Sequence, residues 1–171
     1  MSSESTVSRI LDGIGRWFSS AGEALPLGAR IPSVTLPDDS GNSVNLSGMG
    51  ATGWLLVYFY PRADTPGCTK QACSLRDSYA ELLDLGAHVY GASLDSVERQ
   101  REFRTKHHLP FPLLADTEAE LAEAFGVPHS FGFTRRQAFL FKDGVLVWRD
   151  LSAATDQQAA DALAAIRAAK A

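Results

Sequence analysis

The 171-residue sequence predicts a three-layer α/β domain, because two hydrophobic patterns alternate along the chain. Short runs of consecutive apolar residues indicate strands that are buried on both faces. Between these runs lie segments whose apolar residues share one face of a helix. Strands that alternate with helices form a sheet with helices packed against both of its faces. A domain of this length buries about 70% of the surface that its unfolded chain exposes, so its core does not depend on disulfides.

The first 24 residues differ from the rest and are predicted to form an N-terminal amphipathic helical extension to the domain at residues 25–171. One helical stripe of this segment consists of Val7, Ile10, Leu11, Ile14, Trp17 and Phe18. The segment lacks the basic start and the continuous apolar stretch of a signal peptide. We expect the helix to pack on the domain or on a second subunit. Contact of residues 4–18 with a membrane surface and a disordered tail are the alternatives.

The domain is predicted to open with a β-hairpin and to continue into a buried strand. Strands at residues 31–36 and 43–46 flank a segment rich in turn-forming residues. Residues 54–60 are continuously apolar and end at Pro61, which indicates a central strand. A helix is predicted over residues 65–86, where Gly86 ends it.

The second half of the domain repeats this alternation. The predicted strands are residues 88–94, 111–115, 136–141 and 145–151, the last two joined by a turn at residues 142–144. Asp95 and Glu98 have the spacing of a capping box and open a helix that extends to about residue 108. Residues 117–120 are predicted to cap a short helix that ends at Gly126, and residues 155–158 to cap the last helix.

Composition excludes several classes of function. The formal net charge of −4 argues against a nucleic-acid binder, whose phosphate contacts need clustered Lys and Arg. The longest apolar run, residues 54–60, is far shorter than the ~20 residues that span a bilayer. We therefore expect no nucleic-acid partner and no membrane partner. The protein is further expected to be cytoplasmic, to need no cofactor and to be a monomer, with a dimer as the alternative.

Cys68 and Cys73 are the two cysteines of the chain, too few for a disulfide framework. Only the thiolate is a competent nucleophile, and a free cysteine thiol is only about 3% ionised at neutral pH. Cys68 follows a buried strand and stands at the start of a helix, where unpaired N–H groups and the helix dipole favour an anion. A helix terminus supplies less than the ~2.7 kcal/mol that a two-unit decrease in a thiol pKa requires, so a nearby cation is needed as well.

The helical phase of the two cysteines separates their sulfur atoms. Cys68 falls on the apolar stripe with Ala72 and Leu75, whereas Cys73 faces solvent. Helix geometry places the Cα atoms of residues i and i+5 about 8.6 Å apart, and a disulfide tolerates about 7 Å at most. The pair can therefore bond only if the first part of this helix unwinds, which fits a bond made transiently during turnover. A static disulfide within a loop remains an alternative.

A metal site is the other alternative for the cysteine pair. Its further ligands would come from His88, His107, His108 or His129. The chain has no second pair of ligands with the spacing typical of zinc sites.

The segment YFYPRADTPGCTKQACSLRD at residues 58–77 resembles the peroxiredoxin family, within it the bacterioferritin-comigratory-protein, or PrxQ, class. Pro61, Thr65 and Cys68 match its P-x-x-x-T-x-x-C signature, with the second cysteine five residues further on. Residues 25–46 and 136–141 also resemble the family, so the similarity covers about residues 25–171.

The resemblance implies a thioredoxin-like fold with a central mixed sheet, an N-terminal β-hairpin and helices on both faces. It implies a thiol-dependent peroxidase that reduces hydrogen peroxide and organic hydroperoxides. By the resemblance, Cys68 is the peroxidatic cysteine and forms a sulfenic acid. Cys73 is the resolving cysteine and forms a disulfide with Cys68, which a thioredoxin-like dithiol donor reduces.

The resemblance also assigns roles to three other residues. Thr65 would donate a hydrogen bond to the thiolate or the peroxide, and Pro61 would shield the sulfenic acid from water. Arg136 would supply the cation beside Cys68. Arg135 is the alternative, because neighbours on a strand point to opposite faces and only one of the two arginines can reach Cys68. A redox-sensing or binding protein on the same scaffold is the alternative function, which only the N-terminal helix favours.

Overall fold

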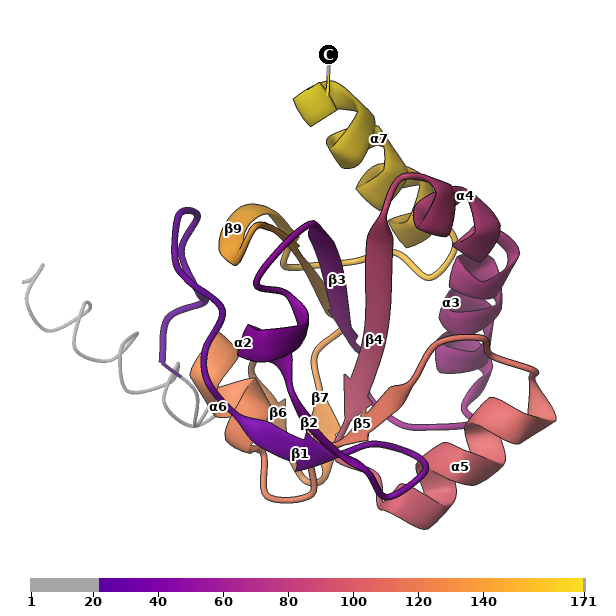
Figure 1. Ribbon diagram of the computed structural model, residues 1–171. Coiled ribbons are helices and arrows are strands. Elements are labelled where there is room, and N and C mark those ends of the chain that lie inside the picture. Colours follow the sequence, from indigo (N-terminus) through magenta and orange to yellow (C-terminus); the bar gives the residue numbers. More distant parts are fainter. Residues whose placement is uncertain (1–21, 171) are drawn as a thin grey trace, which may run out of the picture.

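The computed structural model describes residues 22–170, so residues 1–21 of the predicted N-terminal helical extension lie outside it. A five-stranded mixed sheet forms the centre of the domain (Figure 1). Its strands, in spatial order, are β5 (Leu113–Ala115), β4 (Ala87–Ser93), β3 (Trp54–Phe59), β8 (Gln137–Lys142) and β9 (Val145–Asp150). Strands β3, β4 and β5 are parallel, and β8 is antiparallel to both of its neighbours.

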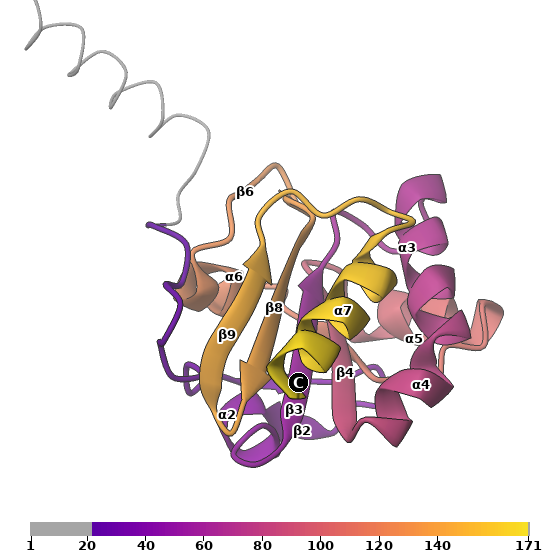
Figure 2. The same cartoon turned by 90° about the horizontal axis from the view of Figure 1, so that it is seen from above.

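Successive side chains of β3 point to opposite faces of the sheet and join two separate hydrophobic cores. One core packs beneath α3 (Pro66–Asp77), α4 (Tyr79–Asp84), α5 (Val97–Lys106) and α7 (Gln158–Lys170). The other packs beneath β1 (Thr35–Pro37), β2 (Ser43–Asn45), α2 (Leu46–Met49) and α6 (Glu120–Phe125). Figures 1 and 2 show α3 and α7 on one side of the sheet and α6 on the other. The predicted three-layer α/β architecture is confirmed.

The hairpin at the start of the domain and the turn between β8 and β9 are also confirmed. Asp143 and Gly144 have φ values of 48° and 82°, the left-handed conformation that a two-residue hairpin turn requires. The first hairpin is shorter than predicted, because β1 begins only at Thr35 and β2 ends at Asn45. The Asn45 side chain accepts a hydrogen bond from the Ser47 N–H at 3.0 Å, and this cap starts α2 at Leu46.

The single helix predicted over residues 65–86 is wrong, since the structure has two helices there. Ser78 separates α3 from α4 with a ψ of 1°, outside the helical region. Serine competes for backbone hydrogen bonds and is a weak helix former, so the interruption falls at a residue that permits it. Gly86, with a φ of 78°, follows α4 as expected.

The predicted caps of α5 and α6 are also wrong. Ser96 caps α5, because its hydroxyl accepts the Arg99 N–H at 3.3 Å. The carboxylate of Asp116 accepts the N–H groups of Leu121 and Ala122 at the start of α6, at 3.0 and 2.9 Å. Ser96 lies within the predicted capping segment 95–98, and Asp116 directly precedes the predicted segment 117–120. In α5 the change leaves the Asp95 carboxylate available for another contact.

A two-stranded hairpin that the sequence did not predict stands between α6 and β8. It consists of β6 (His129–Ser130) and β7 (Phe133–Thr134). The Thr134 hydroxyl donates to the backbone carbonyl of Tyr60 at 2.9 Å, which joins this hairpin to the end of β3.

Candidate active site

The register of two strands brings distant parts of the sequence together at one edge of the sheet. Phe59, the last residue of β3, lies opposite Gln137, the first residue of β8. The loop that leaves β3 leads into α3, and Arg136 immediately precedes β8. The loop after β3 and the residues just before β8 therefore lie close together, although almost 80 positions separate them in the sequence.

Cys68 is the third residue of α3 and is only 1% exposed. The first intrahelical hydrogen bond runs from the Thr69 N–H to the Thr65 carbonyl at 2.8 Å. The N–H groups of Gly67 and Cys68 precede it and have no acceptor within the helix. The sulfur thus lies at the positive end of the helix dipole, an environment that favours an anion.

Arg136, and not Arg135, contacts the Cys68 sulfur. Its Nη2 lies 3.6 Å from Cys68 Sγ, and its Nη1 donates a hydrogen bond to Gln71 Oε1. Arg135 is exposed. A Cβ atom at Gly67 would stand 3.1 Å from Arg136 Nη2, closer than most Cβ contacts, so glycine leaves room for the guanidinium at this point.

Gln71 is a site residue that the sequence analysis did not identify. It is fully buried on α3 and donates from Nε2 to Gln158 Oε1, at the start of α7, over 2.7 Å. The signal was present, because Cys68, Gln71, Ala72 and Leu75 form the buried stripe of α3. A buried amide within such a stripe needs hydrogen-bond partners, and here Arg136 is one of them.

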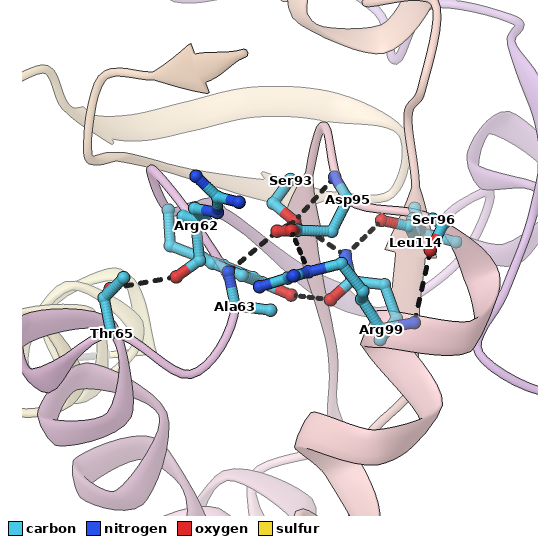
Figure 3. A network of polar contacts seen from close by, with 10 residues as sticks. Arg62, Ala63, Thr65, Ser93, Asp95, Ser96, Arg99 and Leu114 are labelled. Atoms are coloured by element: carbon cyan, nitrogen blue, oxygen red, sulfur yellow. Dashed lines mark hydrogen bonds and ion pairs between the residues drawn. The ribbon is translucent and has the colours of Figure 1, made fainter.

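Thr65 and Pro61 lie on the loop between β3 and α3, and both are partly exposed. Thr65 is the N-cap residue of α3. Its hydroxyl donates to the Arg62 carbonyl at 3.0 Å, within the loop itself (Figure 3). Pro61 follows Tyr60 directly at the end of β3.

Asp95 anchors this loop from the neighbouring strand (Figure 3). One oxygen of its carboxylate accepts the Ala63 N–H at 2.7 Å and the Ser93 hydroxyl at 2.6 Å. The other oxygen accepts from Arg99 Nε at 3.1 Å. The side chain is thus the connection between the loop, the end of β4 and α5.

Asp64 makes a second connection between the loop and α5. Its carboxylate lies 2.8 Å from Lys106 Nζ and 3.1 Å from His107 Nε2. The hydrogen bond from Lys106, followed by that from His107, holds the pKa of Asp64 below its usual value. Asp64 has a φ of 60°, a conformation that aspartate adopts more readily than most residues. The loop before Cys68 is therefore held at two points.

Tyr58 and Tyr60 extend from β3 into the same core as Cys68. Burial, the largest cause, raises the pKa of both phenols well above the ordinary value, and the proximity of Cys68 raises both further. The Tyr60 hydroxyl donates to Gln100, whereas the buried Tyr58 hydroxyl has no hydrogen-bond partner among the described residues. The floor of the site is therefore neutral and mostly apolar.

Cys73 lies on α3 with Cys68, is partly exposed and, like Cys68, is a free thiol. The helix runs without interruption from Pro66 to Asp77, so both cysteines belong to one continuous helix. The predicted placement of Cys68 on the buried stripe is confirmed, and Cys73 lies off that stripe as expected.

Two of the four histidines that the sequence offered as metal ligands have carboxylate partners. His107 lies 3.1 Å from Asp64, and His129 lies 2.7 Å from Glu123. Within residues 22–170, no group of three or more His, Cys, Asp or Glu side chains is arranged to hold a metal ion. The same part of the chain contains no helix that is both long and apolar enough to cross a membrane.

Comparison with known families identifies the fold and the chemistry. The model of the AhpC/TSA family matches residues 27–149. The chain belongs to the AhpC/TSA family. Peroxiredoxin Bcp of Bacillus subtilis is 38% identical over 135 residues, which cover 73% of this chain and 85% of that protein. The chloroplastic peroxiredoxin Q of Oryza sativa is 42% identical over 122 residues, 70% of this chain and 56% of the rice protein.

Solved structures of family members superpose closely on this chain. The crystal structure of peroxidoxin BcpB from Mycobacterium tuberculosis has a TM-score of 0.79 at 33% identity and covers 84% of this chain and 97% of its own. The bacterioferritin comigratory protein of Xanthomonas campestris has a TM-score of 0.76 at 29% identity, over 88% of this chain and all of its own. The expected thioredoxin-like fold is confirmed. This member of the family is a peroxiredoxin of the Bcp/PrxQ type, a thiol peroxidase.

Replacement of Asp95 by alanine tests the anchoring of the loop. The substitution leaves the Ala63 N–H without its acceptor, so we expect the free energy of unfolding to fall by about 1–3 kcal/mol. The looser loop should also lower the rate constant for peroxide consumption by about tenfold. Urea denaturation and stopped-flow kinetics measure the two effects. Asp84→Ala, the same change at an exposed position, is the control. Equal effects of the two substitutions would contradict the anchoring role.

Proposed function

We propose that this peroxiredoxin reduces hydrogen peroxide and organic hydroperoxides through a cycle in which Cys68 is the peroxidatic cysteine and Cys73 the resolving cysteine. The 3.6 Å contact between Arg136 Nη2 and Cys68 Sγ carries the proposal. It joins a buried thiol at a helix N-terminus to a cation that is charged at every physiological pH. A buried structural cysteine needs no such partner, whereas a nucleophilic cysteine does.

In the proposed first step, the Cys68 thiolate attacks the terminal oxygen of the hydroperoxide. The S–O bond forms as the O–O bond breaks, so the sulfur is oxidised to a sulfenic acid and the peroxide is reduced. The leaving alkoxide or hydroxide takes a proton and departs as an alcohol or water. Negative charge moves onto that oxygen during the step, and the Arg136 guanidinium and the N–H groups of the first turn of α3 are oriented to stabilise it.

Thr65 and Pro61 complete the proposed pocket. Thr65 stands one turn before Cys68, and its hydroxyl would rotate from the Arg62 carbonyl to donate to the bound peroxide. Pro61 would restrict the access of water to the sulfenic acid. Asp95 and Asp64 hold the loop that carries both residues, which fixes their position relative to the sulfur.

The proposed second step is the attack of the Cys73 thiol on the sulfenic acid. The S–S bond forms, the S–O bond breaks and water leaves. Residues five apart in an α-helix have Cα atoms about 8.6 Å apart, whereas a disulfide allows about 7 Å at most. Since both cysteines lie within α3, its first turns must unwind before this bond can form.

A dithiol reductant of the thioredoxin class would close the proposed cycle. One of its thiolates attacks the Cys68–Cys73 disulfide to give a mixed disulfide, and its second thiol releases the reduced enzyme. Cys73 is already partly exposed in the helical form, which supports attack at its sulfur.

A surface hollow beside the site supports organic hydroperoxides as substrates. The hollow of about 380 Å³ lies against the β6–β7 hairpin and is lined partly by the exposed rings of Phe131 and Phe133. Arg62, from the loop before Cys68, lies over the Phe133 ring at 5.6 Å from its centroid. The structure of the Xanthomonas campestris relative was determined to study alkyl peroxide reduction. An alkyl substituent bound against these rings would leave the peroxide group directed toward the loop.

Serine substitutions separate the two proposed cysteine roles. Cys68→Ser should abolish rapid peroxide consumption. Cys73→Ser should consume one equivalent of peroxide at the wild-type rate and then stop as the sulfenic acid, because no thiol remains to resolve it. Stopped-flow kinetics with reduced protein, together with mass spectrometry of Cys68, measures both outcomes. A reaction of wild type no faster than that of a free thiol would eliminate the proposal and leave a binding or sensing role. Unchanged turnover of Cys73→Ser with a thioredoxin would eliminate only its resolving role.

Arginine substitutions test the cation beside the sulfur. Arg136→Met keeps the length of the side chain but loses the guanidinium, so the rate constant with hydrogen peroxide should fall about 10²- to 10³-fold. Arg135→Met makes the same change at the neighbouring exposed residue and should leave that rate constant near the wild-type value. Single-turnover kinetics on the reduced variants measures both. A large decrease for Arg135→Met with none for Arg136→Met would transfer the role to Arg135.

A further inference from the structure

Three side chains, the partly buried Arg136 and the buried Gln71 and Gln158, continue from the Cys68 sulfur into the body of the domain. Arg136 contacts Cys68 with Nη2 and donates from Nη1 to Gln71 Oε1. Gln71 Nε2 in turn donates to Gln158 Oε1 at 2.7 Å. Gln71 and Gln158 are 0% and 1% exposed, so water does not compete for these bonds. The row of contacts connects the residue just before β8 with α3 and α7.

The direction of every hydrogen bond in this row is fixed by the guanidinium. Arginine only donates, so Gln71 must direct its carbonyl oxygen to Arg136 and its amide nitrogen to Gln158. Gln158 must then accept through Oε1, and its own Nε2 is left buried with no hydrogen-bond partner among the described residues. Gln158 accepts from Gln71 while its own donor stays buried and unpaired. The bond from Gln71 therefore fixes the orientation of the Gln158 amide group.

Gln71 lies between Cys68 and Cys73 on the helical segment that must unwind for the disulfide to form. Unwinding moves Gln71 and breaks its bonds to Arg136 and Gln158 together. The nearby ion pair between Lys70 and Asp156, at 3.5 Å, also joins α3 to the segment before α7. Both of its side chains are more than half exposed, so it adds little. Gln158 therefore supplies the buried polar restraint from α7 on this part of α3.

We propose that Gln158 is a positioning residue of the peroxidase reaction. Through Gln71 it keeps Arg136 against Cys68, and it keeps the first turns of α3 helical. The start of α7 therefore sets how readily the oxidised Cys68 leaves its pocket to meet Cys73. The inference rests on the proposed roles of Cys68, Cys73 and Arg136.

The hydrogen bond between Gln71 and Gln158 has opposite effects on the attack on peroxide and on disulfide formation. A fixed Arg136 accelerates the attack on peroxide, whereas a stable helix delays the disulfide. While the helix persists, the sulfenic acid of Cys68 is exposed to a second hydroperoxide. That reaction transfers one more oxygen to the sulfur, gives a sulfinic acid and releases the alcohol or water. The fraction of Cys68 that becomes sulfinic acid at a given peroxide concentration thus reports the competition between unwinding and overoxidation.

Gln158→Leu removes the acceptor for Gln71 at similar side-chain size. We expect the rate constant of the first step with hydrogen peroxide to fall about tenfold, because Arg136 loses its fixed orientation. We expect disulfide formation to become about tenfold faster, since the unwound form is no longer disfavoured by the loss of a buried hydrogen bond. The fraction of sulfinic acid should fall accordingly. Gln157→Leu makes the same change at the exposed neighbouring residue and should leave both steps at wild-type values.

Gln71→Glu tests the same row with the opposite expected sign. Its carboxylate accepts from Arg136 through one oxygen, and Gln158 with its amide reversed can donate its unpaired Nε2 to the other. The restraint is then stronger, so disulfide formation should slow and the fraction of sulfinic acid should rise. Both oxygens of the new carboxylate have donors, and Gln158 keeps one unpaired buried atom as in the wild type, so this variant provides the test if Gln158→Leu does not fold.

Stopped-flow kinetics and mass spectrometry of reduced protein after graded additions of hydrogen peroxide give both rates and the sulfinic fraction. A slower first step together with faster disulfide formation in Gln158→Leu supports the inference. General destabilisation of the protein does not change the two rate constants in opposite directions. Wild-type kinetics in Gln158→Leu, or equal shifts in Gln157→Leu, overturn it while the proposed cycle stands. A wild-type protein that forms no Cys68–Cys73 disulfide overturns the proposed cycle and the inference together.

Discussion

The position of both cysteines on one helix is the constraint on which the proposed cycle depends. The N-terminus of α3 gives Cys68 its burial and its environment of N–H groups, so the first step requires the helix. The same helix separates Cys68 from Cys73 by more than a disulfide can span, so the second step requires that the helix open. One segment must therefore adopt two conformations in each cycle, and each must be accessible from the other.

The contacts around α3 form two groups: those that can persist when the helix opens and those that must break. Asp95 binds the loop before the helix, and Asp64 joins that loop to α5, so both contacts lie outside the segment that must open. Arg136 immediately precedes β8, which is paired with β3 in the middle of the sheet. Gln71 differs because it lies within the segment that opens, and its bonds to Arg136 and Gln158 cannot survive the opening. Contacts that can persist during the opening and hydrogen bonds that must break therefore both lie close to Cys68.

Much of this arrangement follows from local sequence pattern. Helical spacing alone predicted that Cys68 is buried and that Cys73 lies off the buried stripe. The chemistry of the thiol predicted that Cys68 needs a nearby cation, and the family resemblance indicated Arg136 as that cation. The contact of Asp95 with Ala63 could not be predicted, because the two residues are 32 positions apart and the spacing of Asp95 to Glu98 suggested a helix cap. Gln71 was missed for a related reason, since its partners come from the residue before β8 and from α7, and no local pattern encodes them.

Amide hydrogen exchange across residues 68–76 tests the unwinding of α3 most directly. The account predicts faster exchange in the disulfide-bonded protein than in the reduced protein, because a Cys68–Cys73 bond and an intact helix exclude one another. Exchange in β3, which stays within the sheet, should be the same in both forms and serves as the internal reference. Equal protection of residues 68–76 in the two redox forms, with the disulfide verified by mass spectrometry, would contradict the account.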